Sequence, residues 1–251
     1  MGLDIYAGTL TRYYTHNWKT AAQQFAEANG LNFHTIRPQQ PEPELSVEEM
    51  KEIVMQWRDN IISGLELDPV PLWKEDYDIT PYYTDKPDWD AINALLLYIS
   101  AKYMNREVPA TIEKNADIYE HPVVKEFLET KDFKVSLFDG NGWWLPIDRN
   151  IMFDYVLPNS EESTLTTSAL LLAELNRYNA FEWNADRDTI ISWSTTEGYP
   201  ADATYSRENG YEETELHEVY ETESLARFAF SILWQAAEFS LAHGTVIVFD
   251  F

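Results

Sequence analysis

One short segment near the N-terminus combines side chains of varied chemistry. Within seven residues it holds a guanidinium, two phenols, an imidazole and an indole, at Arg12, Tyr13, Tyr14, His16 and Trp18. The apolar pattern places this segment at a junction between a strand and a helix, where free helix N–H groups favour an anion. An anion-binding site is therefore one interpretation. The other is that the rings pack the junction while Arg12 pairs with an acid from the body of the protein.

A second concentration of functional side chains lies in residues 82–89, which include Tyr83 and Asp85. If residues 11–18 and 82–89 face each other, they can line one concave and partly apolar cavity, as enzyme pockets do. A hydrolase with a pocket formed by residues 11–18 and 82–89 is accordingly the enzymatic hypothesis. The alternative is a loop fixed by proline, followed by a capped helix.

The adjacent pair Trp143 and Trp144 is the third candidate. Neighbouring residues of a strand point to opposite faces, which leaves one of the two indoles free to be exposed. An exposed Trp suits a contact with a sugar or with a protein. A carbohydrate-binding module that uses an exposed Trp is thus a further alternative, weakened by the lack of an export signal in the first residues.

Motifs of the common catalytic classes are missing from the sequence. It holds no GxxxxGK[ST], GxGxxG, GxSxG or SxxK pattern and no cysteine, and none of its five histidines has the spacing of a zinc site. Pairs of carboxylates carry no weight as glycosidase sites, because 43 acids produce such pairs by chance. We therefore predict no catalytic residue, no metal and no cofactor.

Charge is the strongest feature of the composition. Lys and Arg number 18 against 43 Asp and Glu, for a net charge of −25, whereas residues 1–40 hold three bases and two acids. Residues 202–223 hold eight acids and a single base, Arg207. Such a field repels nucleic acids and anionic lipids and steers basic molecules towards the protein. We expect a basic protein as partner, with no nucleic acid and no membrane; the oligomeric state stays open.

The pattern of apolar residues predicts both helices and strands. Ser46 and Glu49 form a capping box for a helix that ends at Gly64. Leu3–Ala7 and Thr245–Phe251 are apolar on both faces and predict buried strands that pair in one sheet. We further predict a continuation of the first strand through Thr9–Tyr14, helices over 17–29, 88–104, 122–128, 168–178 and 225–243, a β-hairpin over 133–147, strands over 151–157 and 189–193, and a loop over 159–167.

The order of these elements favours an α+β fold over a doubly wound sheet, because strands and helices do not alternate. We expect a mixed or mainly antiparallel sheet with the terminal strands paired, covered by four to five helices. Residues 1–251 are predicted as a single domain, and a mainly helical part (1–118) followed by a mixed strand–helix part (119–251) is the alternative. No apolar run approaches the ~18 residues of a membrane span, and a cytoplasmic location is expected.

The leading functional hypothesis is a non-enzymatic, acidic binding protein. Its net charge, its dense acidic stretch and its lack of catalytic motifs favour an inhibitor or immunity-type protein that neutralises a basic partner, such as a bacterial nuclease toxin. The hydrolase and the carbohydrate-binding module stand as the two alternatives.

Overall fold

The computed structural model describes residues 2–32, 45–200, 203–206, 210–213 and 217–251, with no side-chain description between 201 and 216. The chain forms two compact units. Unit 1 comprises Met1–Lys86, Val135–Glu174 and Trp234–Phe251, and unit 2 comprises Pro87–Lys134 and Leu175–Leu233. These boundaries differ from a split after residue 118. The expectation of one domain stays a prediction, because compact units can belong to the same domain.

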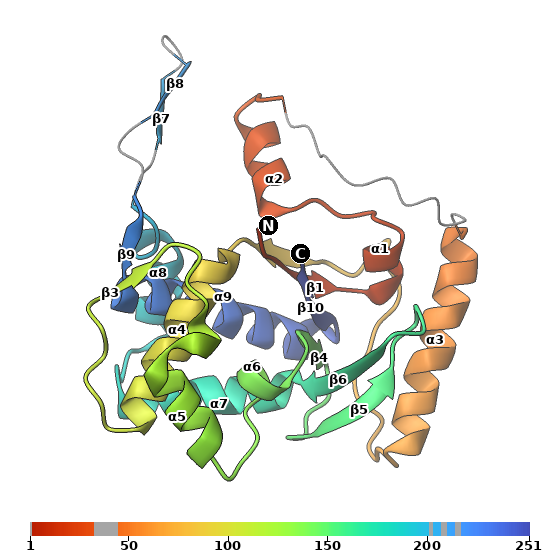
Figure 1. Ribbon diagram of the computed structural model, residues 1–251. Coiled ribbons are helices and arrows are strands. Elements are labelled where there is room, and N and C mark those ends of the chain that lie inside the picture. Colours follow the sequence, from red (N-terminus) through yellow and green to blue (C-terminus); the bar gives the residue numbers. More distant parts are fainter. Residues whose placement is uncertain (1, 33–44, 201–202, 207–209, 214–216) are drawn as a thin grey trace. The chain divides into compact units, whose positions relative to one another are not determined.

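Unit 1 is built on a mixed six-stranded sheet of order β2-β1-β10-β4-β6-β5 (Figure 1). Its strands β4 and β6 are parallel, and its other neighbouring pairs are antiparallel. The predicted pairing of the two terminal strands is confirmed, since β1 lies directly against β10. In chain order the strands are β1 (Asp4–Gly8), β2 (Tyr83–Asp85), β4 (Trp143–Leu145), β5 (Met152–Val156), β6 (Glu162–Thr167) and β10 (Val246–Asp250).

Apolar residues on both faces of β1 and β10 place these strands in the centre of the sheet. Tyr6 pairs in register with Val248, and both belong to a core cluster on one face. Ile5, Ala7 and Ile247, on the opposite face, are completely buried as well. A strand with two buried faces needs neighbours on both sides, which explains why the chain ends are paired with each other.

The helix α3 (Val47–Gly64) covers the Tyr6 face of the sheet. Its capping box is confirmed: Glu49 N–H donates to the Ser46 hydroxyl, and Ser46 N–H donates to the Glu49 carboxylate. The buried stripe of α3 includes Trp57, whose Nε1 donates to the Val156 carbonyl at 2.6 Å and so holds α3 beside β5 (Figure 1). Unit 1 also contains α1 (Leu10–Tyr14), α2 (Ala21–Ala28), α6 (Ser136–Asp139) and parts of α7 (Ser168–Phe181) and α9 (Thr222–His243).

Unit 2 is mainly helical and is packed around aromatic side chains. Trp183 stacks on Tyr98 at 5.0 Å and meets the edge of Phe230 at 5.1 Å between ring centroids. The helices are α4 (Asp88–Tyr103), α5 (Pro122–Thr130), α8 (Arg187–Thr196), the rest of α7 and α9, and a 3₁₀ turn at Ile118–Glu120. Two pairs of strands accompany them: β3 (Thr111–Glu113) with β9 (Val219–Glu221), and β7 (Ala203–Ser206) with β8 (Gly210–Glu213).

The α+β class is confirmed. The described residues form nine α-helices, more than the four to five expected to cover the sheet. Six of them lie where the apolar pattern predicts helices, and α1, α6 and α8 lie where strands were predicted. Within the same described ranges, no helix is both long and apolar enough to cross a membrane.

Three predicted strands are helical, and in two of them, α1 and α8, a side chain caps the first turn. Thr9 accepts a hydrogen bond from Arg12 N–H, which starts α1 where β1 was expected to continue. Asp186 accepts from Thr189 N–H at 2.8 Å and starts α8 where a strand over 189–193 was expected. The hairpin over 133–147 is also wrong: α6 occupies its first half, and β4 pairs with β10 and β6. Each cap satisfies backbone donors that a strand would have paired with a neighbour.

The predicted loop over 159–167 contains β6, a strand with neighbours on both sides. The polar composition of β6 favoured the prediction of a loop, although Leu165, Thr166 and Thr167 are completely buried. The Thr166 hydroxyl donates to the Trp143 carbonyl at 2.9 Å and the Thr167 hydroxyl to the Arg149 carbonyl, so burial leaves neither group unsatisfied. The first long helix also differs, beginning at Ala21 after the Thr20 cap rather than near Trp18.

Candidate functional site

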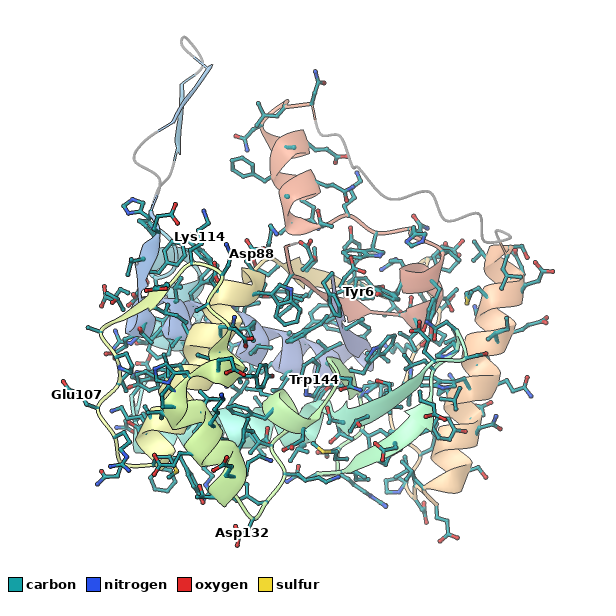
Figure 2. All side chains as sticks on the ribbon, in the orientation of Figure 1. Tyr6, Asp88, Glu107, Lys114, Asp132 and Trp144 are labelled. Carbon is teal, nitrogen blue, oxygen red and sulfur yellow. The ribbon has the colours of Figure 1, made fainter. Side chains whose placement is uncertain are left out.

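The predicted strand–helix junction exists and is centred on Tyr6 of β1, which is labelled in Figure 2. The Tyr6 ring lies 4.8 Å from Trp18, 5.5 Å from Tyr13 and 6.0 Å from Tyr82 between centroids. It also lies directly over Gly8, where an added Cβ would be 2.2 Å from the Tyr6 hydroxyl oxygen. The chain can therefore leave β1 under this ring only with glycine at that position.

The same packing includes Trp143 of β4. Its ring meets the edge of Tyr13 at 6.0 Å and stacks with Tyr14 at 6.5 Å. We call Tyr6, Tyr13, Tyr14, Trp18, Tyr82 and Trp143 the aromatic cluster. Four of the predicted site residues, Tyr13, Tyr14, Trp18 and Trp143, are thus brought together.

Arg12 lies beside this cluster and is only 8% exposed. Its guanidinium donates to the carbonyls of Thr80, at 2.9 Å, and Tyr77, and it lies 4.9 Å from the centre of the Tyr82 ring. Within the described residues it forms no ion pair, so the expected pairing with an acid is wrong. Two carbonyls and an aromatic face satisfy the cation instead, and they tie α1 to the segment before β2.

A buried carboxylate that sequence reasoning missed, Glu75, completes the junction. One oxygen accepts from Thr11 N–H and from the Thr11 hydroxyl, both at 3.0 Å, and the other accepts from Trp73 Nε1 at 3.1 Å. Burial raises the pKa of Glu75, and the Thr11 and Trp73 hydrogen bonds oppose that rise. Nothing in the sequence separates this glutamate from the other acids of the chain.

Besides Arg12, four predicted residues lie outside the aromatic cluster. His16 is exposed, with a φ of 53°. Tyr83 and Asp85 pair with Ala7 and Ile5 and therefore lie on the opposite face of the sheet. There the Tyr83 hydroxyl donates to Asp85 at 3.2 Å, and burial raises the pKa of Asp85. Trp144 packs on Phe249, 4.8 Å away.

Both tryptophans of the adjacent pair are buried. Trp143 is 9% exposed and Trp144 is 1% exposed; Figure 2 labels Trp144 on β4. The two indoles do point to opposite faces, but each face is covered. The expectation of an exposed Trp is therefore wrong at this pair, and a carbohydrate-binding module that depends on it is not proposed further.

The two charged groups of the junction, Arg12 and Glu75, form their hydrogen bonds within the protein. Arg12 donates to backbone carbonyls, and Glu75 accepts from Thr11 and Trp73. The completely buried Tyr6 ring fills the space between Trp18 and Tyr82. Burial also raises the pKa of the Tyr6 and Tyr14 hydroxyls, so neither is an accessible base near neutral pH. The arrangement stabilises the fold, and the hydrolase stays an untested prediction.

A different feature of unit 1 concentrates charge at the surface, around the first half of α3. Glu48, Glu49 and Glu52 are exposed on this helix, and Asp76 and Asp78, exposed on the segment before β2, lie beside it. The proximity follows from Lys51 Nζ, which lies 3.6 Å from Asp76, and from Tyr77, whose pKa is raised first by Asp78 and further by Glu48. We call these five carboxylates the acidic face of α3.

Large apolar side chains are exposed next to the acidic face. Ile53 is 38% exposed and follows Glu52 in α3, and Ile79 is 79% exposed and follows Asp78. Apolar spots rimmed by charge are typical of protein–protein contact surfaces. The acidic face of α3 thus combines negative charge with exposed apolar area beside it.

Comparison of the chain with protein-family models, with curated proteins and with solved structures gives no match. Among the described residues, no group of three or more His, Asp or Glu side chains is arranged to hold a metal ion.

Proposed function

We propose that this chain is a non-enzymatic binding protein that recognises a basic protein partner, as an inhibitor or immunity-type protein would. The observation that carries the proposal is the convergence of two separate segments on the acidic face of α3. Glu48 and Glu49 also suit the first turn of a helix, where carboxylates complement the dipole. Asp76 and Asp78 come from another segment and have no such role, so their position beside the helix supports a surface that attracts cations.

The physical basis is steering at long range and apolar contact at short range. A net charge of −25 accelerates the approach of a basic protein, and this effect falls as salt rises. Ile53 and Ile79 supply the apolar area that distinguishes a specific complex from a charge encounter. The acidic stretch 202–223 belongs to the same hypothesis, but most of its side chains lie outside the described residues.

The test compares two variants with equal changes in net charge. One neutralises the acidic face, as Glu48→Gln, Glu52→Gln, Asp76→Asn and Asp78→Asn; Glu49 is kept because it caps α3. The matched control neutralises four exposed acids elsewhere in unit 1, as Glu66→Gln, Asp148→Asn, Glu161→Gln and Glu162→Gln.

Immobilised wild type and both variants are incubated with a lysate of the source cells at low and at high salt. We expect wild type and the control variant to retain the same basic protein at low salt, and the acidic-face variant to lose it. If wild type retains no basic protein at either salt, the proposed function is wrong. If both variants retain it equally, the acidic face is not the binding surface.

A further inference from the structure

A surface pocket of about 340 Å³ lies in unit 1, between the second half of α3 and the segment that follows it. Its volume is in the range of small-molecule sites, which begin at roughly 300 Å³. Four apolar side chains line it, Ile62, Val70, Pro71 and Trp73, together with the charged pair Arg58 and Asp59. Val70 is 69% exposed, so this apolar wall is open to solvent.

Arg58 gives this pocket a specific polar group. One terminal nitrogen donates to the Trp73 carbonyl at 3.1 Å, which fixes the guanidinium against the pocket wall. Nε and the other terminal nitrogen both contact a single oxygen of Asp59, at 2.9 and 2.8 Å. The Arg58 side chain is 18% exposed, and that of Asp59 is 62% exposed. The edge of Arg58 formed by Nε and this second terminal nitrogen is thus paired with only one oxygen of a solvated neighbour.

This edge of Arg58 matches a carboxylate that uses both of its oxygens. A guanidinium edge binds a carboxylate through two parallel N–H···O bonds, an arrangement that adjacent residues in one helix do not reach here. An incoming acid can therefore replace Asp59, whose own carboxylate is left in water at little cost because it is already largely exposed. The apolar lining then receives the hydrocarbon part of the ligand.

From this geometry we infer that the pocket between α3 and Val70–Trp73 binds a small monocarboxylic acid with an aromatic or short alkyl body. The carboxylate pairs with Arg58, and the body packs on Ile62, Val70, Pro71 and Trp73. This site is separate from the acidic face of α3 and does not depend on a basic partner. Either proposal can fail while the other stands.

The experiment uses phenylacetate as probe and phenylacetamide as its neutral analogue. Binding to the full chain is followed by amide chemical shifts at physiological ionic strength, where a Debye length of about 8 Å screens the distant acids. We expect saturable shifts at Ile62, Val70 and Trp73 with phenylacetate, and affinity about tenfold weaker for phenylacetamide, because the amide lacks the charge-assisted hydrogen bonds.

Two variants test whether phenylacetate binding depends on the ion pair between Arg58 and the ligand carboxylate. Arg58→Met should lower phenylacetate affinity about tenfold and leave phenylacetamide affinity unchanged. Asp59→Asn keeps the fold and removes the competing carboxylate, so phenylacetate should bind a few-fold more tightly than to wild type. Weaker or equal binding of phenylacetate to Asp59→Asn would overturn the inference. Equal affinity for acid and amide in wild type, or no saturable shift up to about 10 mM, would overturn it as well.

Discussion

At the scale of single residues, two carboxylates of unit 1 are enclosed by hydrogen-bond donors. Glu75 receives donors on both oxygens, and Glu174 receives the Ser136 N–H and hydroxyl. Burial raises the pKa of Glu174 to about 7, an effect that the Ser136 bonds oppose and the neighbouring Asp139 charge increases. Glu174 in the native state therefore keeps its proton up to about pH 7, whereas in the unfolded chain it loses this proton near pH 4.3.

The ionisation of Glu174 makes the stability of the native state depend on pH. Between about pH 4.3 and 7 the native state binds more protons than the unfolded state, so stability falls as pH rises through this window. Glu174→Gln keeps an acceptor for Ser136 and removes the charge. The unfolding free energy of this variant relative to wild type should be about 2–3 kcal/mol higher at pH 8 than at pH 5, as measured by urea titration.

The exposed residue Glu162 provides the control for this measurement. Glu162→Gln should change stability by less than about 0.5 kcal/mol at both pH values. A Glu174→Gln effect that is the same at pH 5 and pH 8 would show that Glu174 is ionised in the native protein throughout this range.

Two aromatic residues that the helical pattern treats alike differ in the structure. Trp57 is 7% exposed and donates a hydrogen bond to Val156, whereas Phe228 of α9 is only partly buried. Trp57→Ala should cost about 3–5 kcal/mol of unfolding free energy, and Phe228→Ala about 1–2 kcal/mol. Urea titration with Phe25→Ala as the exposed control measures both. Equal losses would mean that burial does not decide the cost at these positions.

At the scale of elements, β10 lies between β1 and β4 and carries three almost completely buried apolar residues, Val246, Ile247 and Val248. Burial of each is worth about 1.5–3 kcal/mol, and a domain has only about 5–15 kcal/mol in total. A chain that ends at Gly244 would also leave β1 and β4 with unpaired edges. We expect this chain to be insoluble or to unfold without a cooperative transition.

Removal of the last residue alone is the matched control, because Phe251 is 72% exposed and lies outside β10. That chain should melt close to the full-length protein in calorimetry. A cooperative transition of the chain ending at Gly244, near the full-length melting temperature, would show that β10 is peripheral to unit 1.

Local signals in the sequence identified elements where the chain itself supplies the cap or the core face. The Ser46–Glu49 box located α3, and apolar residues on both faces located β1 and β10. Short helices were missed because their caps resemble turn residues, as at Thr9 before α1 and Asp186 before α8. β6 was missed because its threonines are satisfied by carbonyls far along the chain.

The candidate site was only partly predictable for the same reason. Tyr13, Tyr14 and Trp18 are close in sequence, and their concentration could be recognised. The contact of Tyr13 and Tyr14 with Trp143 depends on the order of strands in the sheet, which local pattern does not encode. The burial of Trp143 and Trp144 could not be predicted either. Alternation along a strand places them on opposite faces of the sheet but does not tell which faces are covered.

At the scale of the whole molecule, the net charge of −25 sets a cost on folding. Folding brings the carboxylates closer together than they are in the unfolded chain, and their mutual repulsion opposes the compact state. Several ion pairs of the described residues have both side chains exposed, for example Lys19–Glu27 and Arg106–Glu126, and such pairs contribute little to stability. Repulsion should therefore dominate the response to salt.

We expect the melting temperature to rise as sodium chloride increases from about 10 to 200 mM, since the Debye length falls from roughly 30 Å to below 10 Å over this range. The variant with four neutral residues in the acidic face of α3 should show a smaller rise, because it carries less repulsion to screen. An equal concentration of sucrose serves as the uncharged control. A melting temperature that falls with salt would mean that attractive ion pairs outweigh the acidic excess in the folded protein. In that case the clustered carboxylates would be balanced locally, and an acidic surface that steers a basic partner would lose its physical basis.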